Sequence, residues 1–210
     1  MRPPAIGGVM AGHEPSPESV ALLEKLVAAL KRRGIATEED IALRRAAAER
    51  ATPETGARMV AKAWTDPAFH ELMQRDGTAA AEAMGVPMRG QPPLGVLVDT
   101  ASVHHLVVCT LCSCYPRAVI GYPPHWYKSA AYRARAVREP RAVLAEWGTV
   151  LPAGVQVRVV DSTADYRWMV LPRRPAGTEG WSEDALAAIV TRDDLVGVTL
   201  PSAERARTAA

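Results

Sequence analysis

The chain has 210 residues, enough for one domain of good size or for a smaller domain with an extension. Its hydrophobic content of 48% and charged content of 23% are typical of a folded soluble protein. The formal net charge of +2 is too balanced for the basic surface of a nucleic-acid-binding protein. No apolar run approaches the ~18 residues that a membrane span needs. The apolar stretch 5–12 is short and follows only Arg2, so we expect no secretory signal and a cytoplasmic protein.

The N-terminal part is predicted to be helical. Residues 1–15 are rich in proline and glycine and show no periodicity, so we expect a disordered lead-in there. Apolar residues then recur at helical spacing in four stretches, at 16–34, 37–50, 53–64 and 66–85. Ser16 and Thr37 stand where N-caps are expected. Residues 16–90 therefore predict a helical extension with little core of its own, and such a segment more often covers a partner.

The C-terminal part mixes strands and helices. Valine-rich stretches bounded by turn residues predict buried strands at 94–100 and 103–109, and alternation predicts a strand pair at 155–161 and 166–172. Helices are expected at 125–136, 140–146 and 182–190, the last capped by Ser182. The predicted fold class is α+β, with the N-terminal helical arm followed by an α/β domain of layered sheets and helices at 91–200 and a disordered tail at 201–210.

All three cysteines of the chain lie within six residues, as Cys109, Cys112 and Cys114. An odd number of clustered cysteines cannot form a disulfide framework, and such clusters in a reducing compartment bind metal or carry out chemistry. Buried thiols without a function are one alternative. Zinc would need His104 or His105 as a fourth ligand, and the usual iron–sulfur cluster needs four thiolates. A further possibility adds the backbone nitrogens of Ser113 and Cys114, which as deprotonated amides suit a compact trivalent ion.

The segment VCTLCSCYP around the cysteines resembles the metal-binding segment of nitrile hydratase α subunits. The resemblance extends over about residues 16–198, through KAWTDPAF, DGTAA, YPPHWYKS, YRARAVREPR, LPRRPAGTEGWSE and VTRDDLVGV. Residues 109–114 are called the claw below, and the domain at 91–200 becomes a metal-binding catalytic domain. Since Thr110 occupies the second claw position, the resemblance implies a cobalt-type subunit, with a non-corrin Co(III) in preference to Fe(III).

The resemblance also implies the ligands, the reaction and the partners. The metal ligands would be the sulfur atoms of Cys109, Cys112 and Cys114 and the amides of Ser113 and Cys114. Cys112, as a sulfinic acid, and Cys114, as a sulfenic acid, would be the catalytic residues in the hydration of a small nitrile to an amide. A β subunit would be an obligate partner, with αβ pairs forming a heterotetramer, and a maturation chaperone would load the cobalt.

Several polar residues are candidates for the substrate pocket or the surroundings of the metal. His104 and His105 are adjacent on a strand, so we expect their side chains on opposite faces. One of them could form a hydrogen bond near the claw, and a core histidine with satisfied hydrogen bonds is the alternative for each. Asp161 and Ser162 end a predicted strand and match a family pair near the pocket. Arg167 resembles an interface position of the family. A buried anionic centre needs cations, which in the family come from the β subunit. Four arginines of this chain offer an alternative source, although a solvated surface or a subunit interface is the better interpretation of them: Arg133, Arg135, Arg138 and Arg141.

Arg117 departs from the cobalt nitrile hydratase pattern, in which an aromatic residue lines the substrate pocket. A cation there resembles the γ subunit of thiocyanate hydrolase, a close relative that acts on an anion. A third interpretation is a non-catalytic zinc-binding interaction module that uses the three cysteines and His104. Zinc without oxidised cysteines would identify that module, and cobalt with oxidised cysteines would exclude it.

Overall fold

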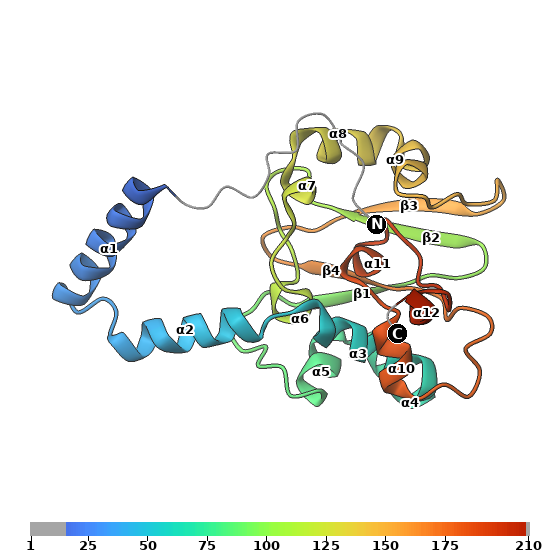
Figure 1. The fold of residues 1–210 in the computed structure, drawn as a ribbon, viewed down its shortest axis with the longest axis horizontal. Coiled ribbons are helices and arrows are strands. Elements are labelled where there is room, and N and C mark those ends of the chain that lie inside the picture. Colours follow the sequence, from blue (N-terminus) through green and yellow to red (C-terminus); the bar gives the residue numbers. More distant parts are fainter. Residues whose placement is uncertain (1–15, 209–210) are drawn as a thin grey trace.

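The computed structural model describes residues 16–208, where four strands form two parallel two-stranded sheets (Figure 1). Strand β1 (Leu94–Val98) pairs with β4 (Arg167–Leu171), and β2 (Val103–Val108) pairs with β3 (Gln156–Asp161). The predicted positions of the strands are confirmed, but β3 and β4 do not pair with each other as we expected. Their backbones continue other ladders: the Ser162 amide donates to the Val108 carbonyl, and the Arg167 amide donates to the Pro93 carbonyl.

Helices cover both outer sides of the sheets, so the predicted fold class of layered sheets and helices is confirmed (Figure 1). Helices α8 (Ala130–Arg138) and α9 (Pro140–Glu146) lie over β2 and β3. Helices α3 (Pro53–Thr65), α4 (Pro67–Arg75), α5 (Gly77–Ala83) and α10 (Glu183–Ala188) lie on the other side, around β1 and one another. The core between these layers contains the fully buried side chains of Met59, Leu106, Met169 and Leu195.

The predicted helical extension divides into two parts. Helices α1 (Pro17–Arg32) and α2 (Glu38–Arg50) form an arm that extends away from the body, and α1 buries none of its residues (Figure 1). Helices α3 to α5, which we had assigned to the same extension, instead belong to the body. Their apolar faces supply buried side chains such as Phe69 and Met73 to the common core. The arm is therefore shorter than the expected 16–90.

Two predicted helices are each broken into two. Asp76 interrupts the fourth one because its backbone is extended and its carboxylate accepts the Ala79 amide, which starts α5. Ser129 similarly separates α7 (His125–Lys128) from α8, and its hydroxyl accepts the Tyr132 amide. The predicted caps Ser16, Thr37 and Ser182 are confirmed, because each side chain accepts an amide of its helix.

The C-terminal segment packs back onto the sheets. Helix α11 (Arg192–Val196) ends at Gly197, whose φ of 85° and contact with the His105 carbonyl exclude a side chain. The expected disorder from residue 201 does not hold for the described residues, because Pro201 is buried and Arg205, at the start of α12 (Arg205–Thr208), pairs with buried Asp194. The predicted lead-in at 1–15 lies outside the described residues. Among the described helices, none is long and apolar enough to cross a membrane.

Candidate metal centre

The claw begins directly after β2, at the edge where two parallel strands end. Val108, the last residue of β2, lies opposite Asp161, the last residue of β3. Because the carboxyl ends of parallel strands meet at one edge of a sheet, a loop after β2 is within reach of side chains at the end of β3. The claw therefore starts at the end of a buried strand, which agrees with the strand predicted at 103–109.

The three cysteine sulfur atoms of the claw converge. The Sγ atom of Cys112 lies 3.5 Å from that of Cys109 and 3.3 Å from that of Cys114, and all three lie within 4.8 Å of one another. Two thiolates bound at right angles to one ion at about 2.3 Å would lie about 3.3 Å apart. Thiolates are also the soft donors that transition metals prefer. The three sulfur atoms could therefore hold one metal ion.

The three thiols differ in environment. Cys109 and Cys114 are buried, and Cys112 is exposed. Hydrogen bonds from the Cys114 thiol and the Ser113 amide, with a smaller contribution from Cys109, lower the pKa of Cys112 to about 7. Burial raises the pKa of Cys114 to about 12, against the nearby positive charge of Arg167. Cys112 thus ionises more readily than Cys114, and it is exposed.

Asp161 anchors the first half of the claw. Its carboxylate accepts the Thr110 amide, at 3.1 Å, and the Thr110 hydroxyl. Ser162, predicted with it, has a different position. Its side chain is buried and its oxygen accepts the Trp168 amide, at 3.1 Å, so Ser162 connects the end of β3 to β4.

Two further anchors hold the claw. Arg133 was considered only as one of four possible counter-ions, and Tyr127 was not singled out from the sequence. One guanidinium nitrogen of Arg133, on α8, lies 3.0 Å from the Leu111 carbonyl oxygen and 3.4 Å from that of Thr110. The hydroxyl of buried Tyr127, on α7, donates to the Cys114 carbonyl at 2.9 Å. Both residues lie in segments that carried the family resemblance, but no local pattern indicated their contacts with the claw.

The histidine pair does not reach the claw. His104 and His105 are both buried, and their Nδ1 atoms lie 2.9 Å from the two oxygens of Asp99, a residue that we had not singled out. The structure therefore supports the alternative of core histidines with satisfied hydrogen bonds, and not a position of either ring near the claw. Asp99 directly follows β1, and its carboxylate contacts both histidine rings at the beginning of β2. A buried carboxylate needs such partners to offset the loss of its hydration.

The second ring nitrogen of His104 also has a partner, since Nε2 lies 2.8 Å from the Gly197 carbonyl oxygen. A carbonyl only accepts, so Nε2 carries a proton while Nδ1 faces a carboxylate. Burial opposes the charged form, but Asp99 outweighs it and raises the pKa of His104. Burial likewise opposes ionisation of Asp99, and the two histidines outweigh it and lower its pKa. With both nitrogens engaged, His104 is not positioned as the fourth ligand of a zinc site.

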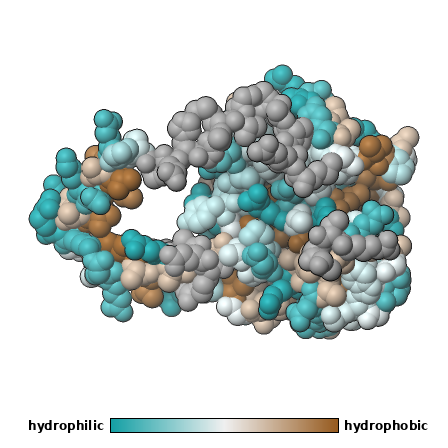
Figure 2. Space-filling view, in the orientation of Figure 1, coloured by the Kyte–Doolittle hydropathy of each residue, from teal (hydrophilic) through white to brown (hydrophobic). Residues whose placement is uncertain are grey.

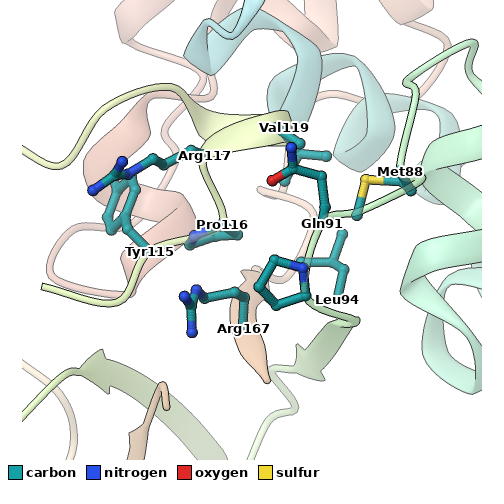
Figure 3. Close-up of a pocket in the computed structure, with 10 residues that line it drawn as sticks. Met88, Gln91, Leu94, Tyr115, Pro116, Arg117, Val119 and Arg167 are labelled. Atoms are coloured by element: carbon teal, nitrogen blue, oxygen red, sulfur yellow. The ribbon is translucent and has the colours of Figure 1, made fainter. Parts of the chain in front are cut away.

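A depression with a volume of about 290 Å³ opens beside the claw, and Cys112 and Cys114 line it. Arg117, Arg167 and Gln91 line it as well, and they come from three separate segments. Figure 3 shows these three side chains around a smaller pocket, which shares them with the depression. Arg117 begins α6 (Arg117–Ile120), and its guanidinium lies 5.2 Å from the ring centre of Tyr122. Arg117 and Arg167, both candidates for the substrate pocket or the surroundings of the metal, thus lie beside the claw, and their roles there stay predictions. Gln91 stands in a Gly-Gln-Pro-Pro stretch that we had interpreted only as a boundary.

Arg167 has an unsatisfied hydrogen-bond donor beside this depression. Its Nη1 atom is buried and has no hydrogen-bond partner among the described residues. Of the four arginines considered as counter-ions, Arg133 contacts the claw. Arg135 instead pairs with Glu139 and Glu146, and Arg141 donates to the carbonyls of the loop before β3. The cations at the open side of the site are therefore Arg117 and Arg167.

Known proteins resemble this chain over most of its length. The α subunit of the low-molecular-weight cobalt-containing nitrile hydratase of Rhodococcus rhodochrous is 53% identical over 150 residues, which are 71% of this chain and 72% of that protein. The γ subunit of thiocyanate hydrolase of Thiobacillus thioparus is 51% identical over 160 residues, which are 71% of this chain and 66% of that protein.

Solved structures show the same fold. A recombinant thiocyanate hydrolase with partially modified cobalt centres superposes with a TM-score of 0.82 and 44% identity, over 90% of this chain and 91% of that one. A double mutant of the Fe-type nitrile hydratase of Comamonas testosteroni also gives 0.82, with 40% identity, over 91% and 94% of the two chains. The family described as nitrile hydratase, alpha chain, matches residues 18–199. With this match and these identities, the chain belongs to the nitrile hydratase α-chain family.

Proposed function

We propose that this chain is the metal-bearing α subunit of a nitrile hydratase that converts nitriles to amides. The observation that carries the proposal is the convergence of the Cys109, Cys112 and Cys114 sulfur atoms within 4.8 Å, at the edge of a depression of substrate size. Membership of the family and the cobalt-containing relative support the same assignment. The amides of Ser113 and Cys114 would complete the ligand set.

The metal is proposed to be a non-corrin Co(III), with Fe(III) as the alternative. Thr110 at the second claw position and the cobalt named for the Rhodococcus rhodochrous relative favour cobalt, although a structural relative is of the iron type. We further propose that Cys112 is a sulfinic acid and Cys114 a sulfenic acid. Elemental analysis of the purified complex, with the intact mass of the claw peptide, tests both statements. Stoichiometric zinc with unmodified thiols would overturn them in favour of an interaction module.

The residues of this chain would bind and orient the substrate. When bound, the cobalt would supply Lewis-acid activation of the nitrile or of water. The unused Nη1 donor of Arg167 could bind an oxygen on the Cys114 sulfur, because a guanidinium pairs well with oxyacids and its charge already acts on that sulfur. Gln91 could donate to or accept from a polar substrate atom. Asp161 and Tyr127 would keep the claw backbone fixed while the substrate exchanges.

The partner is proposed to be a β subunit, with two αβ pairs in a heterotetramer, a small nitrile as substrate, a chaperone for cobalt loading and a cytoplasmic location. The support in this chain is the arm, along which apolar side chains gather (Figure 2). On α1, Leu22, Leu23 and Leu26 are 69%, 59% and 54% exposed. Such a surface is typical of a protein interface.

Replacing both Leu22 and Leu26 by Asp tests this interface. The double variant is expected to lose co-purification with the β subunit, while the isolated chain keeps its stability within about 0.5 kcal/mol because both side chains are exposed. Val150→Asp is the matched control, since Val150 is 82% exposed outside the arm. Normal assembly of the double variant would show that the arm does not bind the partner.

A second function is favoured by the two guanidinium groups at the depression. Arg117 and Arg167 offer positive charge to a small anion such as thiocyanate, on which the Thiobacillus thioparus relative is named to act. Replacing Arg117 by Trp in the assembled enzyme tests this function by kcat/KM for an aliphatic nitrile, a polar aromatic nitrile and thiocyanate. A shift toward the aliphatic nitrile would show that Arg117 selects the substrate. An unchanged ranking would exclude Arg117 from selection.

A further inference from the structure

Arg133 contacts the claw through a backbone group rather than through a side chain. Its Nη1 atom donates to the Leu111 carbonyl oxygen at 3.0 Å and to the Thr110 carbonyl oxygen at 3.4 Å. The contact is made from α8, whose position is fixed by Tyr132, a fully buried neighbour whose hydroxyl donates to the Val107 carbonyl. The guanidinium is therefore held at the outer side of the claw by the same packing that supports β2.

The Leu111 carbonyl belongs to the same peptide group as the Cys112 amide. That amide donates to the Cys109 sulfur atom, at 3.3 Å. A peptide group is planar and its electrons are delocalised, so a cation at the oxygen draws density from the nitrogen and makes the N–H a stronger donor. One peptide group thus connects Arg133 on its oxygen side with the sulfur of Cys109 on its nitrogen side.

We propose that Arg133 is a positioning residue that acts on the Cys109 sulfur through the Leu111–Cys112 peptide group. It fixes the orientation of that group and strengthens its hydrogen bond to the sulfur. This inference rests on the proposed function, because it gives Cys109 the role of a metal ligand. Groups that orient a ligand from behind tune both the affinity and the electronic state of a metal site.

The other two anchors act on different peptide groups. Asp161 accepts the amide that joins Cys109 to Thr110, and Tyr127 donates to the carbonyl that joins Cys114 to Tyr115. Among these three anchors, only Arg133 binds the group that donates to the Cys109 sulfur. Its loss should therefore weaken the hydrogen bond to that sulfur while the rest of the claw stays anchored.

The test uses the full chain, reduced and titrated with cobalt chloride, and records the sulfur-to-cobalt charge-transfer absorption. A hydrogen bond stabilises the sulfur lone pairs and raises the energy of this absorption. In Arg133→Gln the band is expected to move to longer wavelength, and cobalt binding measured against a chelator is expected to weaken by about 10- to 100-fold. Arg133→Lys, which retains the charge, is expected to recover part of both. Arg138→Gln, at the exposed C-terminal end of the same helix, is the matched control and should change neither.

Different results would contradict the proposed metal site and the proposed role of Arg133. Absence of a cobalt–thiolate band in the wild-type chain would overturn the proposed metal site itself. A wild-type band with an unchanged band and affinity in folded Arg133→Gln would overturn only the role of Arg133. If circular dichroism shows that Arg133→Gln does not fold, Arg133→Lys decides. A smaller shift in the same direction then supports the inference, and an unchanged band contradicts it.

Discussion

Strand β2 has a polar cluster at each end, and the two clusters differ in burial and in whether their polar groups are paired within the chain. At its beginning, His104 and His105 are buried against Asp99, and both nitrogens of His104 have partners within the chain. At its end, Cys112 is exposed, and Arg167 beside the claw has a donor without a partner. Both clusters contain side chains that could take part in chemistry. The histidine cluster stabilises the fold because its charges are paired within the chain, whereas the cluster at the claw forms a candidate site because it has, among the described residues, an unpaired donor beside a pocket.

The largest expected effect is the loss of the metal, which we expect only from changes at the claw end of β2. Cys109→Ala should abolish cobalt retention and activity together, because the claw has only three thiolates. Leu111→Ala, which changes an exposed claw side chain without a donor atom, is the control and should retain cobalt. Cobalt content of the purified complex is the measurement. Retention of a full equivalent of cobalt by Cys109→Ala would remove the claw from the metal site.

At the histidine end of β2 we expect a loss of stability without a loss of metal. Asp99→Asn leaves buried His104 without its counter-charge, and breaking a buried ion pair in this way costs about 3–5 kcal/mol. We expect the urea midpoint of the chain to fall accordingly, while the cobalt bound per folded chain stays unchanged. His70→Gln, on α4 and remote from both clusters, serves as a control for general loss of a histidine. A variant that is stable but free of metal would show that the pair serves the claw.

The same pair predicts a pH dependence of stability. The pKa of His104 is raised above its ordinary value of 6.5, so its contribution is full below pH 6.5 and is lost as pH rises through the higher folded value. The pKa of Asp99 is lowered from 3.8, so its contribution is present above pH 3.8 and is lost as pH falls through the lower folded value.

The difference in unfolding free energy between wild type and Asp99→Asn should therefore be greatest between about pH 4 and pH 6.5. It should shrink as the solution becomes alkaline. Urea titrations of both proteins at several pH values measure it. A difference that is constant from pH 5 to pH 9 would mean that His104 is neutral in the fold.

The smallest effect is expected at the claw anchor. Thr110→Val removes a hydroxyl that donates to Asp161 while keeping the size of the side chain, and a lost hydrogen bond of this kind costs about 1 kcal/mol. Thr110→Ser retains the hydroxyl and is the matched control. Thermal unfolding of the apo chain measures the difference. A loss in Thr110→Ser equal to that in Thr110→Val would assign the effect to the methyl group instead of the hydrogen bond.

The sequence predicted what depends on neighbours along the chain. The strand positions, the caps Ser16, Thr37 and Ser182, and the start of the claw at the end of β2 follow from local patterns and are confirmed. The breaks at Asp76 and Ser129 were missed although each residue is a good N-cap, because apolar spacing continued across them.

What the sequence did not reveal depends on distant partners. Asp99 gathers both histidines, and Arg133 reaches the claw from a helix 22 residues beyond Leu111. The pairing of β3 with β2 instead of β4 is likewise a long-range choice, made by packing in the common core. Gln91, in the loop before β1, lines the same depression as Cys112 and Cys114, which lie more than 20 residues further along the chain. No periodicity or spacing encodes these contacts.

The parallel pairing of β2 with β3 has a consequence for the order of biosynthesis. All three thiols have been made once Cys114 has been added, but Asp161, whose carboxylate holds Thr110, lies 51 residues beyond Thr110. Since a chain is synthesised from its N-terminus, the thiols leave the ribosome well before Asp161 can fix their loop. For that interval the three thiols belong to a segment whose geometry the fold has not yet fixed. The geometry that would select among metal ions at the proposed site is therefore complete only after β3 has been made.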